Sequence, residues 1–180
     1  VNFLKVPKLY IFMILGLDAS TTTVGWAIAQ TDSKIVDAGF FDIKKLDSNK
    51  DKSLKLAAFI EGHPNFKDID KVNLEAALSG FCAGRTSQQV IIKLTRFNAV
   101  FEYILSERWS PRISVSLVNV NSARKKLFGK SRESGIKSKE FVKIRLEGIF
   151  DIHTFDKMTV RGNWDDRNSD MYDAMVLALT

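Results

Sequence analysis

The chain of 180 residues is 45% hydrophobic and 27% charged, and its formal net charge is +6. This balance is typical of one globular domain with a sizeable core, and it excludes a disordered polypeptide. No stretch approaches the roughly 18 apolar residues of a membrane span, so no membrane partner is expected. The single cysteine, Cys82, excludes an internal disulfide and indicates a reducing, cytoplasmic compartment.

Apolar runs and their spacing predict five strands and five helices, with no linker that would divide residues 13–180 into two domains. The strands are expected at 13–18, 24–30, 35–43, 71–77 and 113–118. The helices are expected at 54–60, 88–109, 121–128, 138–150 and 168–179, with Ser138 as the N-cap of the fourth and Asn168 or Ser169 as the N-cap of the last. This order predicts an α/β fold, a mixed five-stranded sheet of three antiparallel strands then two parallel strands, flanked by helices. Residues 1–12 are expected to be an N-terminal extension.

The first strand ends on a carboxylate, Asp18, which is followed by a turn of four hydroxyl residues at 20–23 and by Gly25. A carboxylate held at the end of a buried strand can bind a metal ion, and the hydroxyl groups can face a nucleotide phosphate. The simplest interpretation is that Asp18 is a turn residue that ends the strand.

Three more acidic residues occupy unusual positions. Glu75 lies inside the fourth strand, where a carboxylate is costly unless it has a partner. Asp170 and Asp173 lie in the first turn of the last helix, three residues apart and therefore on one face. Taken singly, Glu75 could face solvent from an edge strand, and the two aspartates could serve as helix caps and complement the helix dipole.

The predicted topology brings these four acids together, because the carboxyl ends of neighbouring parallel strands lie at one edge of a sheet. Clustered carboxylates raise one another's pKa unless cations join them. Carboxylate oxygens favour Mg²⁺, for which Mn²⁺ can substitute. Two such ions about 4 Å apart can activate a water and stabilise the leaving oxygen of a phosphodiester. The predicted metal ligands are Asp18, Glu75, Asp170 and Asp173.

A basic segment lies between Arg124 and Arg145, where nine basic residues stand against two acidic ones, and the rest of the chain is close to neutral. Such a cluster of positive charge on an otherwise neutral protein indicates a surface that binds a polyanion. The alternative interpretation is an ordinary solvated helix face.

The four acids and the basic segment together resemble RuvC-type Holliday junction resolvases, which belong to the RNase H-like superfamily. ILGLD at 14–18 with its hydroxyl-rich turn resembles their first motif, VNLE at 72–75 their second acidic motif, and DMYDAMVLA at 170–178 their closing helix. The resemblance covers nearly all of residues 13–180, and a phage or viral branch is favoured. It implies a homodimer that binds four-way DNA junctions and uses Mg²⁺ to nick two strands symmetrically. If a phage encodes it, the protein acts in the cytoplasm of a bacterial host cell.

The same resemblance assigns roles to individual residues. The four acids match the catalytic metal ligands, and Lys139 matches a basic catalytic residue beside the scissile phosphate, with Arg124 as an approximate second match. The family's aromatic residue near the junction centre would fall at Leu78, so the role of splitting a base step is assigned to Phe81, with core packing as its alternative. The residues expected to contact DNA are Arg124, Lys125, Lys126, Lys130, Arg132, Lys137, Lys139, Phe81 and Arg85.

Two other functions stay open. DASTT at 18–22 is similar to the phosphate loop of actin-like ATPases and sugar kinases, and in this alternative the chain is an ATP-binding phosphotransferase fragment. No second phosphate loop follows downstream, which weighs against it. The other alternative is a branched-DNA-binding module without catalysis, against which the complete set of four acids argues. The expected homodimer interface is the apolar face of the long helix, with Phe97 or Phe101.

Overall fold

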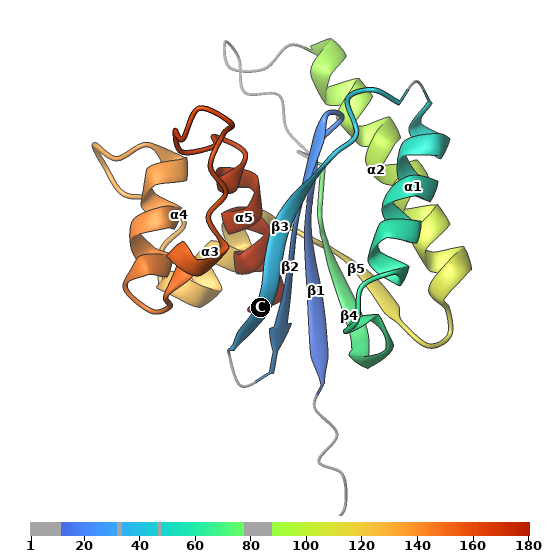
Figure 1. Cartoon of the computed structure of the whole chain (residues 1–180), viewed down its shortest axis with the longest axis horizontal. Helices are drawn as coiled ribbons and strands as arrows, with labels where there is room; N and C mark the ends of the chain where they lie inside the picture. Colours follow the sequence, from blue (N-terminus) through green and yellow to red (C-terminus); the bar gives the residue numbers. More distant parts are fainter. Residues whose placement is uncertain (1–11, 32–33, 47, 78–87) are drawn as a thin grey trace, which may run out of the picture.

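The computed structural model describes residues 12–31, 34–46, 48–77 and 88–180 (Figure 1). A five-stranded sheet forms the centre, with the strands in the order β3-β2-β1-β4-β5. The strands are β1 (Met13–Ala19), β2 (Thr23–Gln30), β3 (Ile35–Asp42), β4 (Ile69–Glu75) and β5 (Ser114–Val118). The first three are antiparallel, whereas β4 runs parallel to β1 and β5 parallel to β4. The predicted mixed sheet is confirmed.

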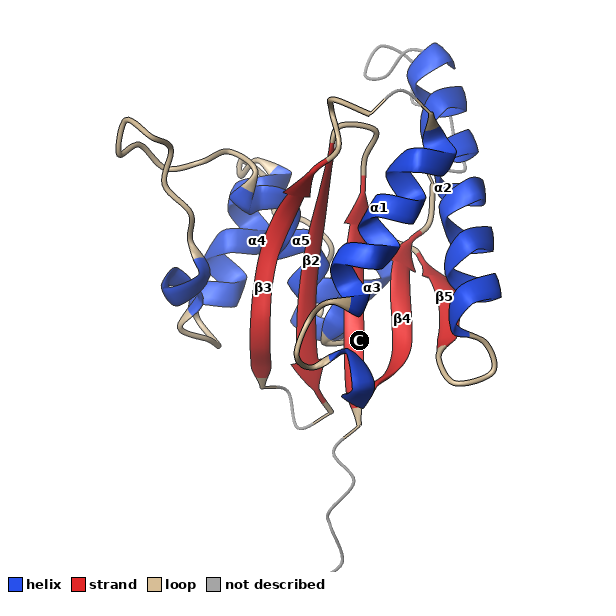
Figure 2. Cartoon of the chain, turned by 45° about the vertical axis from the view of Figure 1, so that its right-hand side comes forward, coloured by secondary structure: helices blue, strands red, loops and turns tan. Residues whose placement is uncertain are grey.

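Helices cover both faces of this sheet (Figures 1 and 2). They are α1 (Asn49–Glu61), α2 (Gln88–Trp109), α3 (Val120–Phe128), α4 (Ser138–Glu147) and α5 (Asn168–Ala178), with short 3₁₀ turns at η1 (Phe66–Asp68) and η2 (Ile152–Phe155). Helices α1 and α2 lie on one side, and α3, α4 and α5 lie on the other. Among the described residues, no helix combines the length and the apolar character that crossing a bilayer requires.

The two faces of the sheet differ in the size of their side chains. Toward α1 and α2 the strands present bulky residues such as Leu17 and Trp26, which pack with Phe97. Toward α5 they present small residues, including Ala27 and Ala29. Because small side chains leave a shallow surface, α5 can lie close against the sheet. A Cβ added at Gly16 of β1 would lie 2.1 Å from a carbonyl oxygen of this helix.

Some helix boundaries differ from the prediction for local reasons. Helix α1 begins at Asn49, ahead of the expected residue 54, because the Ser48 hydroxyl accepts a hydrogen bond from the amide of Asp51 at 3.0 Å. Helix α4 ends at Glu147 rather than at residue 150. Ser138, expected as its N-cap, is its first helical residue, and Lys137 takes the capping position.

The expected dimer contacts at Phe97 and Phe101 are wrong. Both side chains are fully buried in the core between α2 and the sheet, where their rings stack 5.7 Å apart. Helical periodicity alone does not distinguish a face that enters the core from one that meets a partner. The apolar stripe chosen from the sequence is the core-facing one.

Candidate active site

Asp18 and Glu75 project from the same edge of the sheet. Asp18 lies near the end of β1 and Glu75 is the last residue of β4. The parallel register pairs Leu17 with Leu74, so the two acids are the next residues along neighbouring strands. Their carboxyl groups lie close enough to interact directly. Parallel pairing thus converts two positions 57 residues apart into one acidic pair.

Gly25 allows the third acid to join this pair. It lies directly opposite Asp18 in the antiparallel β1–β2 register. A Cβ at Gly25 would lie 2.1 Å from the carbonyl oxygen of Asp170 and 2.3 Å from its carbonyl carbon. Only a residue without a side chain admits the first turn of α5 so close to β2. Asp173, three residues further along the same helix, completes the group, so the structure brings all four predicted acids together.

Burial raises the pKa of Asp18 well above the ordinary carboxyl value, and its hydrogen bond and repulsion with Glu75 raise it further. The charges of the two α5 aspartates act in the same direction. Burial also raises the pKa of Asp173, although the Arg124 guanidinium opposes that change. A half-buried carboxylate cluster of this kind is stabilised when cations enter it.

Two cations of the chain already contact the α5 aspartates. Arg124 donates hydrogen bonds to the Asp173 carboxylate at 2.6 Å and to the Ser138 hydroxyl at 2.7 Å. Lys139 Nζ lies 2.7 Å from the Ser169 hydroxyl and 3.3 Å from Asp170 Oδ1. Arg124 is only 6% exposed, whereas the Lys139 side chain is 65% exposed. The arginine therefore orients an acid from inside, while the lysine remains accessible to an incoming anion.

The donor set fits a hard divalent cation. In the part of the chain that the structure describes, no group of three or more Asp, Glu, His or Cys side chains is arranged to hold a metal as it stands. Asp170 and Asp173 instead contact Lys139 and Arg124. Burial, and after it the neighbouring carboxylates, raises the pKa of Asp18, and Mg²⁺ or Mn²⁺ ligated by carboxylate oxygens would offset the repulsion among these groups.

The hydroxyl-rich turn after Asp18 satisfies much of its own hydrogen bonding. The Ser20 hydroxyl donates to the Thr23 carbonyl at 2.7 Å and accepts from the Thr23 amide at 3.0 Å. Lys52 Nζ donates to the Thr21 carbonyl at 2.6 Å. The Ser20 hydroxyl therefore shapes the connection between β1 and β2, a role that does not require a bound phosphate.

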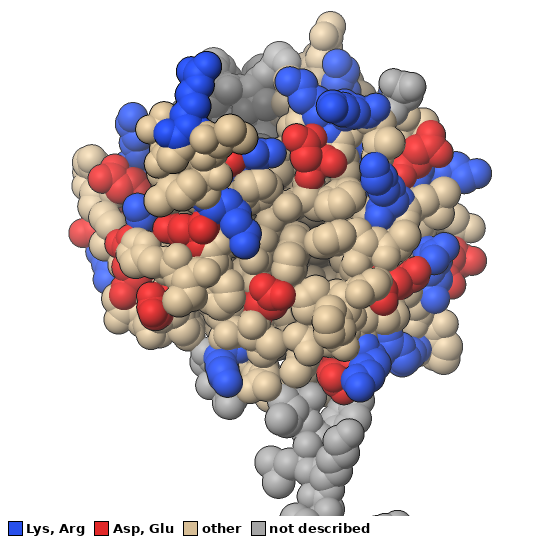
Figure 3. Space-filling view, viewed as in Figure 1, with Lys and Arg blue, Asp and Glu red and all other residues tan. Residues whose placement is uncertain are grey.

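Most residues of the predicted basic surface are exposed. These are Lys125, Lys126, Lys130, Arg132, Lys137 and Lys139. Arg124 does not lie on this surface, contrary to expectation, because it is buried beside Asp173. Glu133 pairs with Lys130 and Arg145 at 2.7 and 3.1 Å. Figure 3 accordingly shows basic and acidic side chains interspersed across one face of the molecule.

Two serines beside the acids contact the neighbouring cations, and two predicted DNA-binding residues are not among the described ones. Phe81 and Arg85 lie outside the described residues, so their expected DNA contacts stay predictions. The sequence predicts Ser169 only as a helix cap, whereas in the structure its hydroxyl contacts Lys139. Its position immediately before Asp170 is the one signal that could have identified it. Ser138 likewise contacts Arg124 rather than capping α4.

The mixed sheet, with a closing helix that sets two aspartates beside the end of β1, has the RNase H-like fold of junction resolvases. RuvC of Thermus thermophilus in complex with a Holliday junction substrate superposes with a TM-score of 0.59 at 13% identity, over 93% of this chain and 90% of that one. The yeast mitochondrial Holliday junction resolvase Ydc2 gives 0.59 at 16% identity, over 92% and 75%. No protein-family model and no curated protein sequence matches the chain.

Proposed function

We propose that this chain is a metal-dependent endodeoxyribonuclease that cuts four-way (Holliday) and related branched DNA with paired, symmetric nicks. The observation that carries the proposal is the convergence of Asp18, Glu75, Asp170 and Asp173 at one edge of the sheet. An accessible lysine borders this cluster, and an exposed basic surface lies on the neighbouring helices. The resolvase fold supports the choice of branched DNA as substrate.

The four acids would hold two Mg²⁺ ions, for which Mn²⁺ can substitute. When bound, the ions supply an activated water and charge stabilisation at the leaving oxygen. Arg124 holds the Asp173 carboxylate in one orientation through a contact of 2.6 Å. Ser169 and Asp170 hold the Lys139 ammonium at the mouth of the cluster, where it can pair with an oxygen of the scissile phosphate.

The exposed lysines and arginines of the basic surface bind the phosphates that flank the cut. Such contacts are electrostatic and carry no sequence information, so binding weakens steeply as salt increases. Because Lys130 and Arg145 pair with Glu133, and Lys126 donates a hydrogen bond to the Thr180 carbonyl oxygen, Lys125 and Lys137 are the stronger candidates for phosphate contacts.

Two symmetric nicks require two active sites, and therefore a second copy of the chain. In place of the buried phenylalanines, the outer face of α2 offers a candidate interface. Ala99, Val100, Tyr103 and Ile104 line a hollow of about 470 Å³ beside Lys50. Tyr103 is 64% exposed, and large amphipathic rings of this kind are enriched at protein interfaces.

A labelled synthetic four-way junction tests the proposed function. We expect paired nicks at symmetric positions with Mg²⁺, none with EDTA, and little cutting of a linear duplex of the same sequence. Asp18→Asn should retain junction binding in a gel and lose at least about 10³-fold in cleavage, because it weakens metal ligation and leaves the basic surface intact.

The alternatives give different results. Binding without cleavage under every divalent ion would support a non-catalytic DNA-binding module. ATP hydrolysis by the wild-type chain, lost in Asp18→Asn, would support the phosphotransferase alternative.

A further inference from the structure

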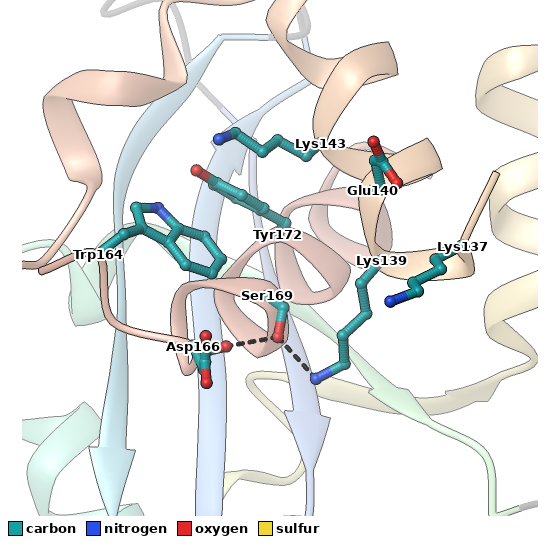
Figure 4. Close-up of a pocket in the computed structure, with 8 residues that line it drawn as sticks. All are labelled: Lys137, Lys139, Glu140, Lys143, Trp164, Asp166, Ser169 and Tyr172. Atoms are coloured by element: carbon teal, nitrogen blue, oxygen red, sulfur yellow. Dashed lines mark hydrogen bonds between the residues drawn. The ribbon is translucent and has the colours of Figure 1, made fainter.

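A pocket of about 430 Å³ opens beside the acidic cluster (Figure 4). The residues that line it are Lys137, Lys139, Glu140, Lys143, Trp164, Asp166, Ser169 and Tyr172. Lys139 and Ser169 also border the proposed active site, so the pocket adjoins it. None of the four acids lines the pocket, and its lining is chemically different from theirs.

Aromatic rings form one side of the pocket, with Lys143 next to them, and Lys137 and Lys139 lie on the other side. The Trp164 and Tyr172 rings lie 6.3 Å apart at 39°. Figure 4 shows Trp164 facing across the pocket toward Lys139 and Lys137, with Lys143 beside the aromatic pair. Lys143 Nζ lies 5.3 Å from the centre of the Trp164 ring. The arrangement offers a flat apolar face next to positive charge.

The aromatic wall is fixed before any ligand arrives. Trp164 pairs with Met158 in an antiparallel bridge. The buried Asn168 side chain bonds both backbone groups of Lys157, at 2.9 and 3.0 Å, and so ties this segment to α5. The Tyr172 hydroxyl donates to Asp156. A rigid site loses little conformational entropy when it binds a ligand.

We propose that this pocket takes one unpaired base of the DNA strand whose phosphate is cut, stacked on Trp164. The inference rests on the proposed function and extends it from the phosphate to the base. Each nucleobase has a flat face that stacks on an aromatic ring, and the lysines suit the phosphates on either side of it. Glu140 and Asp166 supply acceptors for the amino groups of a base.

The size and place of the pocket fit this occupant. Its volume lies within the range of about 300–1,000 Å³ that is usual for small-ligand sites. Bases at a branch point have already lost part of their stacking, so moving one out costs less than it does in a duplex. A base held here fixes the register of the strand relative to Lys139, which gives the enzyme a preferred position of cutting.

Abasic scanning of the junction tests the pocket without changing the protein. Each nucleotide around the mapped cut is replaced in turn by an abasic residue, and single-turnover cleavage is measured. We expect one position to lower wild-type cleavage by about 5- to 150-fold, the range that corresponds to a base–aromatic stack of about 1–3 kcal/mol. Equal cleavage of every abasic substrate would overturn the proposal.

Variants then connect that position to Trp164. Trp164→Ala should cut the intact junction as slowly as the wild type cuts the sensitive abasic one, and it should lose its response to the abasic change. Trp164→Phe, which keeps an aromatic ring, should retain part of the wild-type cleavage rate and part of the response to the abasic change. Val160→Ala, a fully exposed site in the same segment, serves as the matched control and should behave as wild type. If Trp164→Ala folds and keeps full abasic sensitivity, the base binds elsewhere.

These outcomes separate the pocket from the proposed function. A chain that cuts no junction refutes the nuclease. A chain that cuts junctions but ignores both the abasic change and Trp164→Ala refutes only the base pocket.

Discussion

Replacing Gly25 with alanine tests whether the close approach of α5 to β2 positions the acidic cluster. The added Cβ would lie 2.1 Å from the Asp170 carbonyl oxygen and 2.7 Å from the Met171 amide nitrogen. Both are backbone atoms, so no side-chain rotation relieves the overlap. To reach an ordinary contact of 3.4 Å, the first turn of α5 must retreat by about 1.3 Å.

Two separate effects, one on stability and one on catalysis, follow from this displacement. Overpacking a core costs about 1–3 kcal/mol of unfolding free energy. We expect the upper end, because α5 is buried on almost every side. For a chain of this length that corresponds to a fall in Tm of about 6–12 °C. Cleavage should slow as well, since a misplacement of about 1 Å costs about 100-fold in rate.

Thermal unfolding and single-turnover junction cleavage measure the two effects separately. Junction binding should stay close to the wild-type value, because the exposed lysines are unchanged. Gly62→Ala is the matched control, since a Cβ there would meet its nearest atoms at 3.5 Å and its φ of −75° suits alanine. If Gly25→Ala melts and cleaves like the wild type, the contact does not position Asp170 and the reasoning fails.

Three further predictions concern the lysine, the acids and the second copy. Lys139→Ala should slow cleavage by about 10²–10³-fold, the usual cost of removing one donor from a developing anion, and an unchanged rate would place Lys139 outside the site. Between a pH of about 3.8 and the raised pKa of Asp18, the Asp18 carboxyl is protonated in the folded chain and ionised in the unfolded chain. The free energy of unfolding of the metal-free chain therefore decreases as the pH rises through this range. The increase in Tm caused by Mg²⁺ should therefore grow with pH and largely disappear in Asp18→Asn; the same increase at every pH would contradict this coupling. Tyr103→Glu should produce a folded monomer in analytical ultracentrifugation, whereas a variant that remains dimeric would place the interface elsewhere.

The sequence alone predicts the strands of the sheet and the four acids, because the patterns that indicate them lie within short stretches of the chain. Apolar runs mark the strands, and Asp18 is conspicuous because a carboxylate follows such a run directly. Once β1 and β4 are recognised as parallel neighbours, Asp18 and Glu75 must meet at one edge. The pair on α5 follows from helical spacing, since positions three apart share a face.

The features that the sequence did not predict depend on contacts between distant segments. The sequence predicts Arg124 as a DNA-contacting residue and an approximate match to a basic catalytic residue, and only the fold shows that it is buried against Asp173, 49 residues away. Phe97 belongs to an apolar stripe whose direction, inward or outward, is decided by where α2 packs. Trp164 carries no motif at all, because its role in the pocket depends on α4 and α5 lying beside it.

The contrast between the two faces of the sheet has a consequence for how this protein can diverge. Toward α1 and α2, residues such as Leu17 and Phe97 can exchange volume with their neighbours, because compensating swaps between large apolar side chains are usually tolerated. Toward α5, Gly16 and Gly25 have no volume to exchange, since any added atom meets helix backbone. Homologues would therefore vary freely in their bulky core residues while keeping glycine at the positions that lie against the backbone of α5.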